Sequence, residues 1–301
     1  MSFTRKIIQV TLKLGQSNFS GTGADTLTIT GLQVRFHMRQ IIGLKTDVQV
    51  EIFGLTDSQM KQFSTYGSLP NIQTPNLITI AAGDNESGLS VIFHGILKQV
   101  DANYAQPASS ILATALDGAF YAISKAAPVS YKGSADVAII MGNLAAQSSL
   151  NLENSGVSVK LSNPYFSGSI GDQIKSCARA AGINHLVDTT RNVLAIWPRG
   201  GSRGGNAPLV SPQTGLVGYP TFALQQISFV TELNPNIEVG RHVQVESSIP
   251  NAVGTWTVTE IVTDLETETP DGAWFQSVTA FSKLPEFGTS YGQLSDFGGA
   301  K

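Results

Sequence analysis

Residues 32–39 read Leu-Gln-Val-Arg-Phe-His-Met-Arg, so apolar and polar side chains alternate without a break. Because successive side chains of a β-strand point to opposite faces, this period of two predicts a strand with one face in a core. The opposite face carries Arg35, His37 and Arg39. Residues 48–52 repeat the alternation and place Gln49 and Glu51 on the polar face of the next strand.

Outward from this stretch, the chain keeps the character of a strand-rich protein. Its 301 residues are 42% hydrophobic and only 14% charged, with 30 glycines. A chain of this length supplies enough apolar material for two or three domains, and low charge is typical of surfaces that pack against partners. Further strand patterns occur at residues 77–80, 89–103, 110–116, 222–229, 239–245, 256–265 and 274–281, and residues 56–66 are typical of a short helix.

The pattern changes between residues 128 and 199. The spacing of Val137, Ile140, Met141 and Leu144 predicts a helix, for which Ser134 is the expected N-cap. A second helix is expected between a Ser169 cap and Gly182, followed by two strands over residues 185–197 with a turn around 189–192. We interpret this region as a small α+β insertion, after which the Gly-rich residues 198–206 have the composition of a flexible linker.

Two segments on either side of the insertion share one layout. Residues 93–116 and 256–281 each run strand, polar tip with a proline, strand. The repetition predicts two β-barrels, over residues 1–127 and 200–284, around the insertion at 128–199. Residues 285–301 are too sparse in apolar side chains for a core, so they are expected to be disordered or to form an arm that orders on a neighbour.

Charge and cysteine content exclude several classes. The net charge of −3 is unlike that of a globally basic nucleic-acid binder, and residues 201–301 alone hold ten acidic against four basic side chains. A single cysteine, Cys177, excludes an internal disulfide and suits a protein made in a reducing cytoplasm. The sequence shows no signal-peptide pattern and no apolar run of about 20 residues, so we expect no membrane insertion.

Several short motifs stand out along the chain. They are Ala82-Gly-Asp84, Ile92-Phe-His-Gly95, Leu209-Val-Ser-Pro-Gln-Thr-Gly-Leu-Val-Gly-Tyr-Pro220, Leu233-Asn-Pro235 and Gly240 before a strand. Through these motifs, about residues 70–285 resemble the baseplate hub proteins of long-tailed phages. The resemblance implies two tail-tube-like barrels and a homotrimer, in which six barrels form a pseudo-sixfold ring between a sixfold tail tube and a threefold spike. The chain departs from this family in its short second domain and in having no recognisable lysozyme or spike segment.

This resemblance sets the expected partners and location. They are tail-tube or distal tail proteins, a central spike protein and baseplate neighbours in a virion assembled in the host cytoplasm. DNA would pass without specific binding, because an acidic wall repels phosphate. Arg35, His37, Arg39, Gln49 and Glu51 are candidates for subunit contacts or for the lumen, and Phe287, Tyr291 and Phe297 for a docking tail.

Residues for catalysis are sparse, so we expect no catalytic residue, cofactor or metal. The four histidines occur singly, without partners at metal-ligand spacing, and no Gly-Lys-Thr/Ser phosphate loop is present. The alternative is a cell-wall hydrolase, with the acid pair drawn from Glu260, Asp264, Glu266 and Glu268, or a carbohydrate-binding tail protein using Trp256 and Trp274. A phage-derived injection device would share the predicted architecture.

Overall fold

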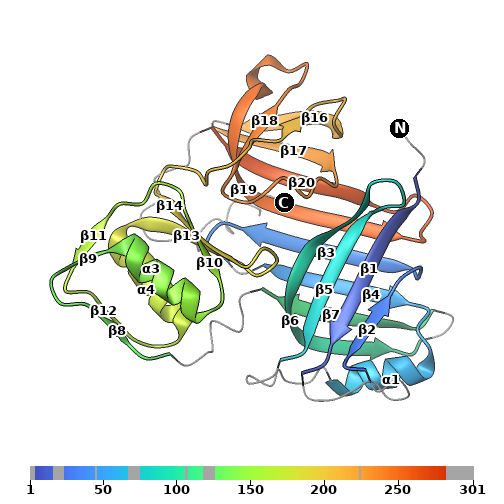
Figure 1. Ribbon diagram of the computed structural model, residues 1–301. Helices are drawn as coiled ribbons and strands as arrows, with labels where there is room; N and C mark the ends of the chain where they lie inside the picture. Colours follow the sequence, from blue (N-terminus) through green and yellow to red (C-terminus); the bar gives the residue numbers. More distant parts are fainter. Residues whose placement is uncertain are drawn as a thin grey trace, which may run out of the picture.

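The computed structural model describes residues 4–15, 24–44, 46–66, 75–105, 108–117, 126–223 and 225–282. The fold is mainly β with a small α+β insertion, which confirms the fold class that the alternating stretches predict. Figure 1 shows the insertion set to one side of two β-rich parts that share a sheet.

The first β-rich part curves around one apolar core. Its elements are β1 (Lys6–Lys13), β2 (Thr26–Ile29), β3 (Val34–Ile41), β4 (Asp47–Phe53), α1 (Asp57–Tyr66), β5 (Leu77–Asp84), β6 (Gly88–Asn103) and β7 (Ser110–Leu116). The inward side chains of every strand join one cluster, because the strands alternate between buried and exposed positions, with an interruption next to the bulge of β6.

The insertion forms a separate small core. It contains β8 (Val129–Ser130), β9 (Ser134–Asp136), α3 (Val137–Gln147), β10 (Asn151–Asn154), β11 (Lys160–Ser162), β12 (Tyr165–Phe166), α4 (Ile170–Ala181), β13 (Ile183–Asp188) and β14 (Val193–Pro198). The predicted caps of α4 are confirmed: Ser169 and Asp172 form a capping box, and Gly182 ends the helix at φ 65°.

The expected Ser134 cap of the first insertion helix is wrong. Ser134 begins β9, which pairs with β11, and the helix starts only at Val137. The cap is Asp136, whose carboxylate accepts the backbone N–H of Ala138 at 2.8 Å. Serine and aspartate are both favourable N-cap residues. Here Ser134 is in the short strand β9, so Asp136 caps the helix.

The second β-rich part has its own core and shares a sheet with the first. It comprises β15 (Leu209–Val210), β16 (Leu216–Ala223), β17 (Gln226–Glu232), β18 (His242–Val245), the 3₁₀ turn η1 (Pro250–Ala252), β19 (Gly254–Thr267) and β20 (Trp274–Phe281). The stretch 222–229, expected as one strand, is split between β16 and β17 by a turn. The two parts join where β3 pairs with the second half of β19.

The same strand order occurs in both β-rich parts. In the first it is β3-β4-β7-β6-β5, and in the second it is β16-β17-β20-β19-β18, with every neighbouring pair antiparallel. In each part the long strand carries a bulge at the same place, at Lys98 in β6 and at Thr259 in β19. The duplicated layout that the sequence suggests is thus present in the hydrogen-bonded order of the strands.

An ion-pair cluster, here called the clamp, joins the insertion to the second β-rich part. Arg203, in the segment expected to be a flexible linker, has a side chain only 1% exposed. Its Nε and Nη2 donate to the two carboxylate oxygens of Glu153 on β10 at 2.9 and 3.0 Å. Its Nη1 lies 3.4 Å from Glu238, and Arg241 also reaches both acids. The segment is therefore a fixed strap rather than a free spacer.

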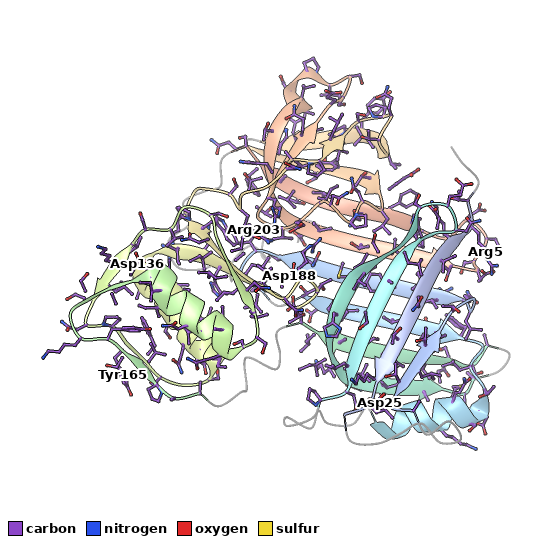
Figure 2. The ribbon with its side chains drawn as sticks, in the orientation of Figure 1. Arg5, Asp25, Asp136, Tyr165, Asp188 and Arg203 are labelled. Atoms are coloured by element: carbon purple, nitrogen blue, oxygen red, sulfur yellow. The ribbon has the colours of Figure 1, made fainter. Side chains whose placement is uncertain are left out.

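Two features surround the clamp. Gly240 has φ 84°, and a Cβ there would lie 2.9 Å from Cδ of Arg203, so the glycine makes room for the arginine. The β13–β14 turn contacts the first β-rich part, where Thr190 accepts the N–H of His94 at 3.1 Å. Figure 2 shows Arg203 and Asp188 where the insertion meets the two β-rich parts.

Candidate interface: a charged face on the shared sheet

The five predicted interface residues lie together on one face. The buried side of β3 is apolar, whereas Arg35, His37 and Arg39 are exposed. The β3–β4 register sets Arg35 opposite Glu51 and His37 opposite Gln49, so the two strands contribute to one surface. The structure therefore brings these side chains together, while the role proposed for them stays a prediction.

Three acids of β19 complete this surface, and the sequence analysis did not place them there. His37 Nδ1 lies 2.6 Å from an Asp264 carboxylate oxygen, and Arg39 Nε lies 2.7 Å from Glu260. Arg35 lies between two acids, 3.8 Å from Glu266 and 3.7 Å from Glu51. We call this surface the ladder face, and it consists of Glu260, Asp264, Glu266, Arg35, His37, Arg39, Asp47, Gln49 and Glu51.

The ladder face has an excess of negative charge. It holds five carboxylates against two arginines, with the basic strand β3 lying between two acidic ones. The side chains of its three bases are about half exposed, at 47–55%. Exposed ion pairs contribute only about 0–1 kcal/mol each. The ion pairs of the ladder face therefore contribute little to the free energy of folding. Their charges are better suited to an interaction with a neighbouring molecule.

The acids considered for glycoside hydrolysis are each paired with a base. Glu260, Asp264 and Glu266 face β3, and Glu268 binds Arg5 at 2.5 Å. The tryptophans considered for sugar stacking, Trp256 and Trp274, are only 8% and 9% exposed and belong to the cores. Neither set is arranged as a free acid pair or an open aromatic platform.

The remaining reactive groups have structural surroundings. Burial and the nearby Lys175 charge lower the pKa of His185 to about 4, so this histidine is neutral at pH 7. Burial also lowers the pKa of His94 and raises the pKa of the Cys177 thiol to about 12. Within the described ranges, no three His, Cys, Asp or Glu side chains are grouped as metal ligands would be.

Two further observations complete the description. The predicted docking residues Phe287, Tyr291 and Phe297 lie outside the described residues. None of the described helices is both long and apolar enough to cross a bilayer.

Solved phage tail proteins share this fold. A tail protein from Neisseria meningitidis MC58 matches with a TM-score of 0.59 at 8% identity, over 91% of this chain and 96% of that one. The 43 kDa tail protein of prophage MuSo2 from Shewanella oneidensis matches with a TM-score of 0.58 at 9% identity, over 91% and 97%. These two matches show that the chain has the fold of solved tail proteins.

The E. coli c3393 protein, a component of the type VI secretion system, also matches. Its TM-score is 0.54 at 10% identity, over 85% of this chain and 75% of that one. Among curated proteins, none matches the sequence.

The family model described as baseplate hub gp41 matches residues 7–271. The chain therefore belongs to the baseplate hub gp41 family, and it is a structural protein of a phage tail baseplate.

Proposed function

We propose that three copies of this chain form a pseudo-sixfold ring that joins a sixfold tail tube to a threefold spike. The observation that carries the proposal is the duplicated strand order. A heterologous contact closes into a ring only when the rotation between like surfaces closes. Two similar β-rich parts in each chain, over residues 1–127 and 200–284 around the insertion at 128–199, allow three chains to present six similar units.

The ladder face is proposed to line the channel of this ring. Its five carboxylates and two arginines leave an excess of negative charge on a half-exposed surface. Such a wall repels the phosphates of DNA, so the genome passes without sticking. In this role the bases of β3 fix the conformations of the acids, and none of the nine side chains needs to act in catalysis.

The proposed partners are those expected of a hub. They are tail-tube or distal tail proteins on one side, a central spike on the other and baseplate neighbours around the ring. Phe287, Tyr291 and Phe297 are proposed to dock on one of these neighbours. The protein would assemble in the host cytoplasm, remain in the virion and have no catalytic activity of its own.

The ring is tested by the mass and symmetry of the purified protein. Light scattering at micromolar concentration is expected to give three times the chain mass. Electron microscopy is expected to show a threefold ring with six similar lobes and the ladder face on its inner wall. A monomer in solution together with no threefold density in assembled tails would reject the proposal.

The tail is tested by truncation after Leu284. The shortened chain is expected to form the same trimer, because the last described residue that packs in or against either core is Phe281, which the truncation keeps. Incorporation into tails should fall, since the aromatic side chains of residues 285–301 are gone. The measurement is the amount of hub in purified tails, compared between full-length and truncated chains, and unchanged incorporation would contradict the docking role.

A further inference from the structure

Within one chain, the two β-rich parts join through the pairing of β3 with β19. Because both parts have the same strand order, an equivalent pairing can form between two chains. We propose that β16 of one copy pairs antiparallel with the end of β6 in the next copy, as β3 pairs with β19 within the chain. This inference rests on the proposed ring and names the strands that close it.

The equivalence of the strands holds residue by residue. The bulges make Lys98 of β6 equivalent to Thr259 of β19. With this alignment, the inward positions also correspond: Leu97 matches Val258, and Val100 matches Ile261, all four of which are buried. The end of β6 is thus the counterpart of the half of β19 that receives β3.

Among the described residues, neither strand has a partner strand along this edge. β5 pairs with β6 as far as Ile96, and Leu97 N–H still donates to the Asn76 carbonyl. From Gln99 to Asn103 the strand pairs with β7 alone, and α1 packs against β6. β16 pairs with β17 and, within the part of the chain that the structure describes, with no other strand. Unpaired edges expose backbone donors and acceptors and invite a strand from another chain.

Exposure of apolar side chains marks the same two edges. Following the pairing through β4 and β17, Phe222 of β16 is the counterpart of Met38 of β3. Phe222 is 47% exposed, whereas Met38, beside its partner strand, is 3% exposed. On the other edge Tyr104, just after β6, is 48% exposed, and its counterpart Leu265 is fully buried. A neighbouring strand would cover both.

The junction within the chain also fixes the register. His37 lies opposite Asp264 and Met38 opposite Thr263. The equivalent pairs across two copies are Thr221 with Asn103 and Phe222 with Ala102. Thr221 and Asn103 occupy the face of the ladder residues, so the ladder face continues without a break from one copy to the next.

The edge of β16 is open over a short length only. Pro220 has no backbone N–H, and the register of β16 shifts between Val217 and Thr221. Natural sheets use prolines and bulges in this way to prevent unselective edge pairing. The pairing is therefore restricted to residues around 221–223, which suits a contact that must select one register.

Cysteine crosslinking tests the register. In a chain carrying both Thr221→Cys and Asn103→Cys, directly opposite residues lie near enough for a disulfide, which needs Cα atoms within about 7 Å. Mild oxidation is expected to convert the protein to covalent dimers and trimers on a non-reducing gel. The native Cys177 has no exposed surface and does not interfere.

The matched control shifts one partner by a single residue. Thr221→Cys with Ala102→Cys leaves Phe222 in place and puts the two thiols on opposite faces of the sheet, and it is expected to give little crosslinking, as is each single variant. A trimer by light scattering that links no faster through Thr221 and Asn103 than through the control pair would overturn the inference and leave the ring standing. A protein that is monomeric in solution and in tails would reject both.

Discussion

Replacing Arg203 with alanine is expected to lower the free energy of unfolding by about 3 kcal/mol, because a buried ion pair is broken and Glu153 must then share Arg241 with Glu238. The variant removes both hydrogen bonds to Glu153 and the contact with Glu238 from a position 1% exposed. Urea unfolding followed by circular dichroism measures the loss. The matched control is Arg199→Ala in the same segment, where the arginine is exposed and little change is expected.

The pH dependence of this loss provides a second measurement. Burial raises the pKa of Glu153, but the hydrogen bond and charge of Arg203, with the charges of Arg241 and Arg191, outweigh it, and the pKa is lowered from 4.5. A carboxyl whose folded pKa is depressed stabilises the protein above its unfolded pKa, and this contribution is lost as the pH falls through the folded pKa. The difference between wild type and Arg203→Ala should therefore be complete at pH 7 and shrink below about 4.5. A difference that grows in acid would contradict the clamp.

Replacing Phe222 with glutamate is expected to abolish the trimer without unfolding the monomer. The side chain is 47% exposed in the single chain, so a charge there remains in water until the ring closes. When the ring closes, the variant lacks the roughly 2 kcal/mol gained at each junction by burying a phenylalanine. At each of the three junctions it also has the free-energy cost of removing a carboxylate from water. Light scattering measures the molar mass and so the amount of trimer. Thermal melting of the diluted protein measures the stability of the monomer.

A control on a surface far from the junction separates a local effect from a general one. Ile139 on α3 is 60% exposed and belongs to the insertion. Ile139→Glu is expected to leave the trimer unchanged. A Phe222→Glu protein that still forms trimers at the wild-type concentration would show that β16 does not lie in a subunit contact.

Much of the fold follows from short-range patterns. The alternation at residues 32–39 predicts β3 and both of its faces, and the capping residues predict α4 to within a residue. Where two nearby residues could both cap a helix, the local pattern does not show which of them does. Ser134 and Asp136 are both good caps, and only pairing with β11 shows that the chain is still extended at Ser134.

The candidate interface could be predicted in part. Its basic strand is visible in the sequence, but the acids that pair with it follow more than 220 positions later. No local period connects them, because their alignment depends on the register between β3 and β19. Arg203 was missed for a similar reason, since the glycines around it are typical of linkers and its acid partners come from β10 and from the loop before β18.

The path of β19 has a mechanical consequence. Its first residues, such as Trp256 and Val258, pack in one core, and Leu265 packs in the other. Between them the strand is bonded on both sides, over eight residue pairs with β3 alone. Torque applied to one half of the molecule is thus transmitted to the other through a continuous strand, and a load directed along β3 and β19 must shear all eight of these pairs together.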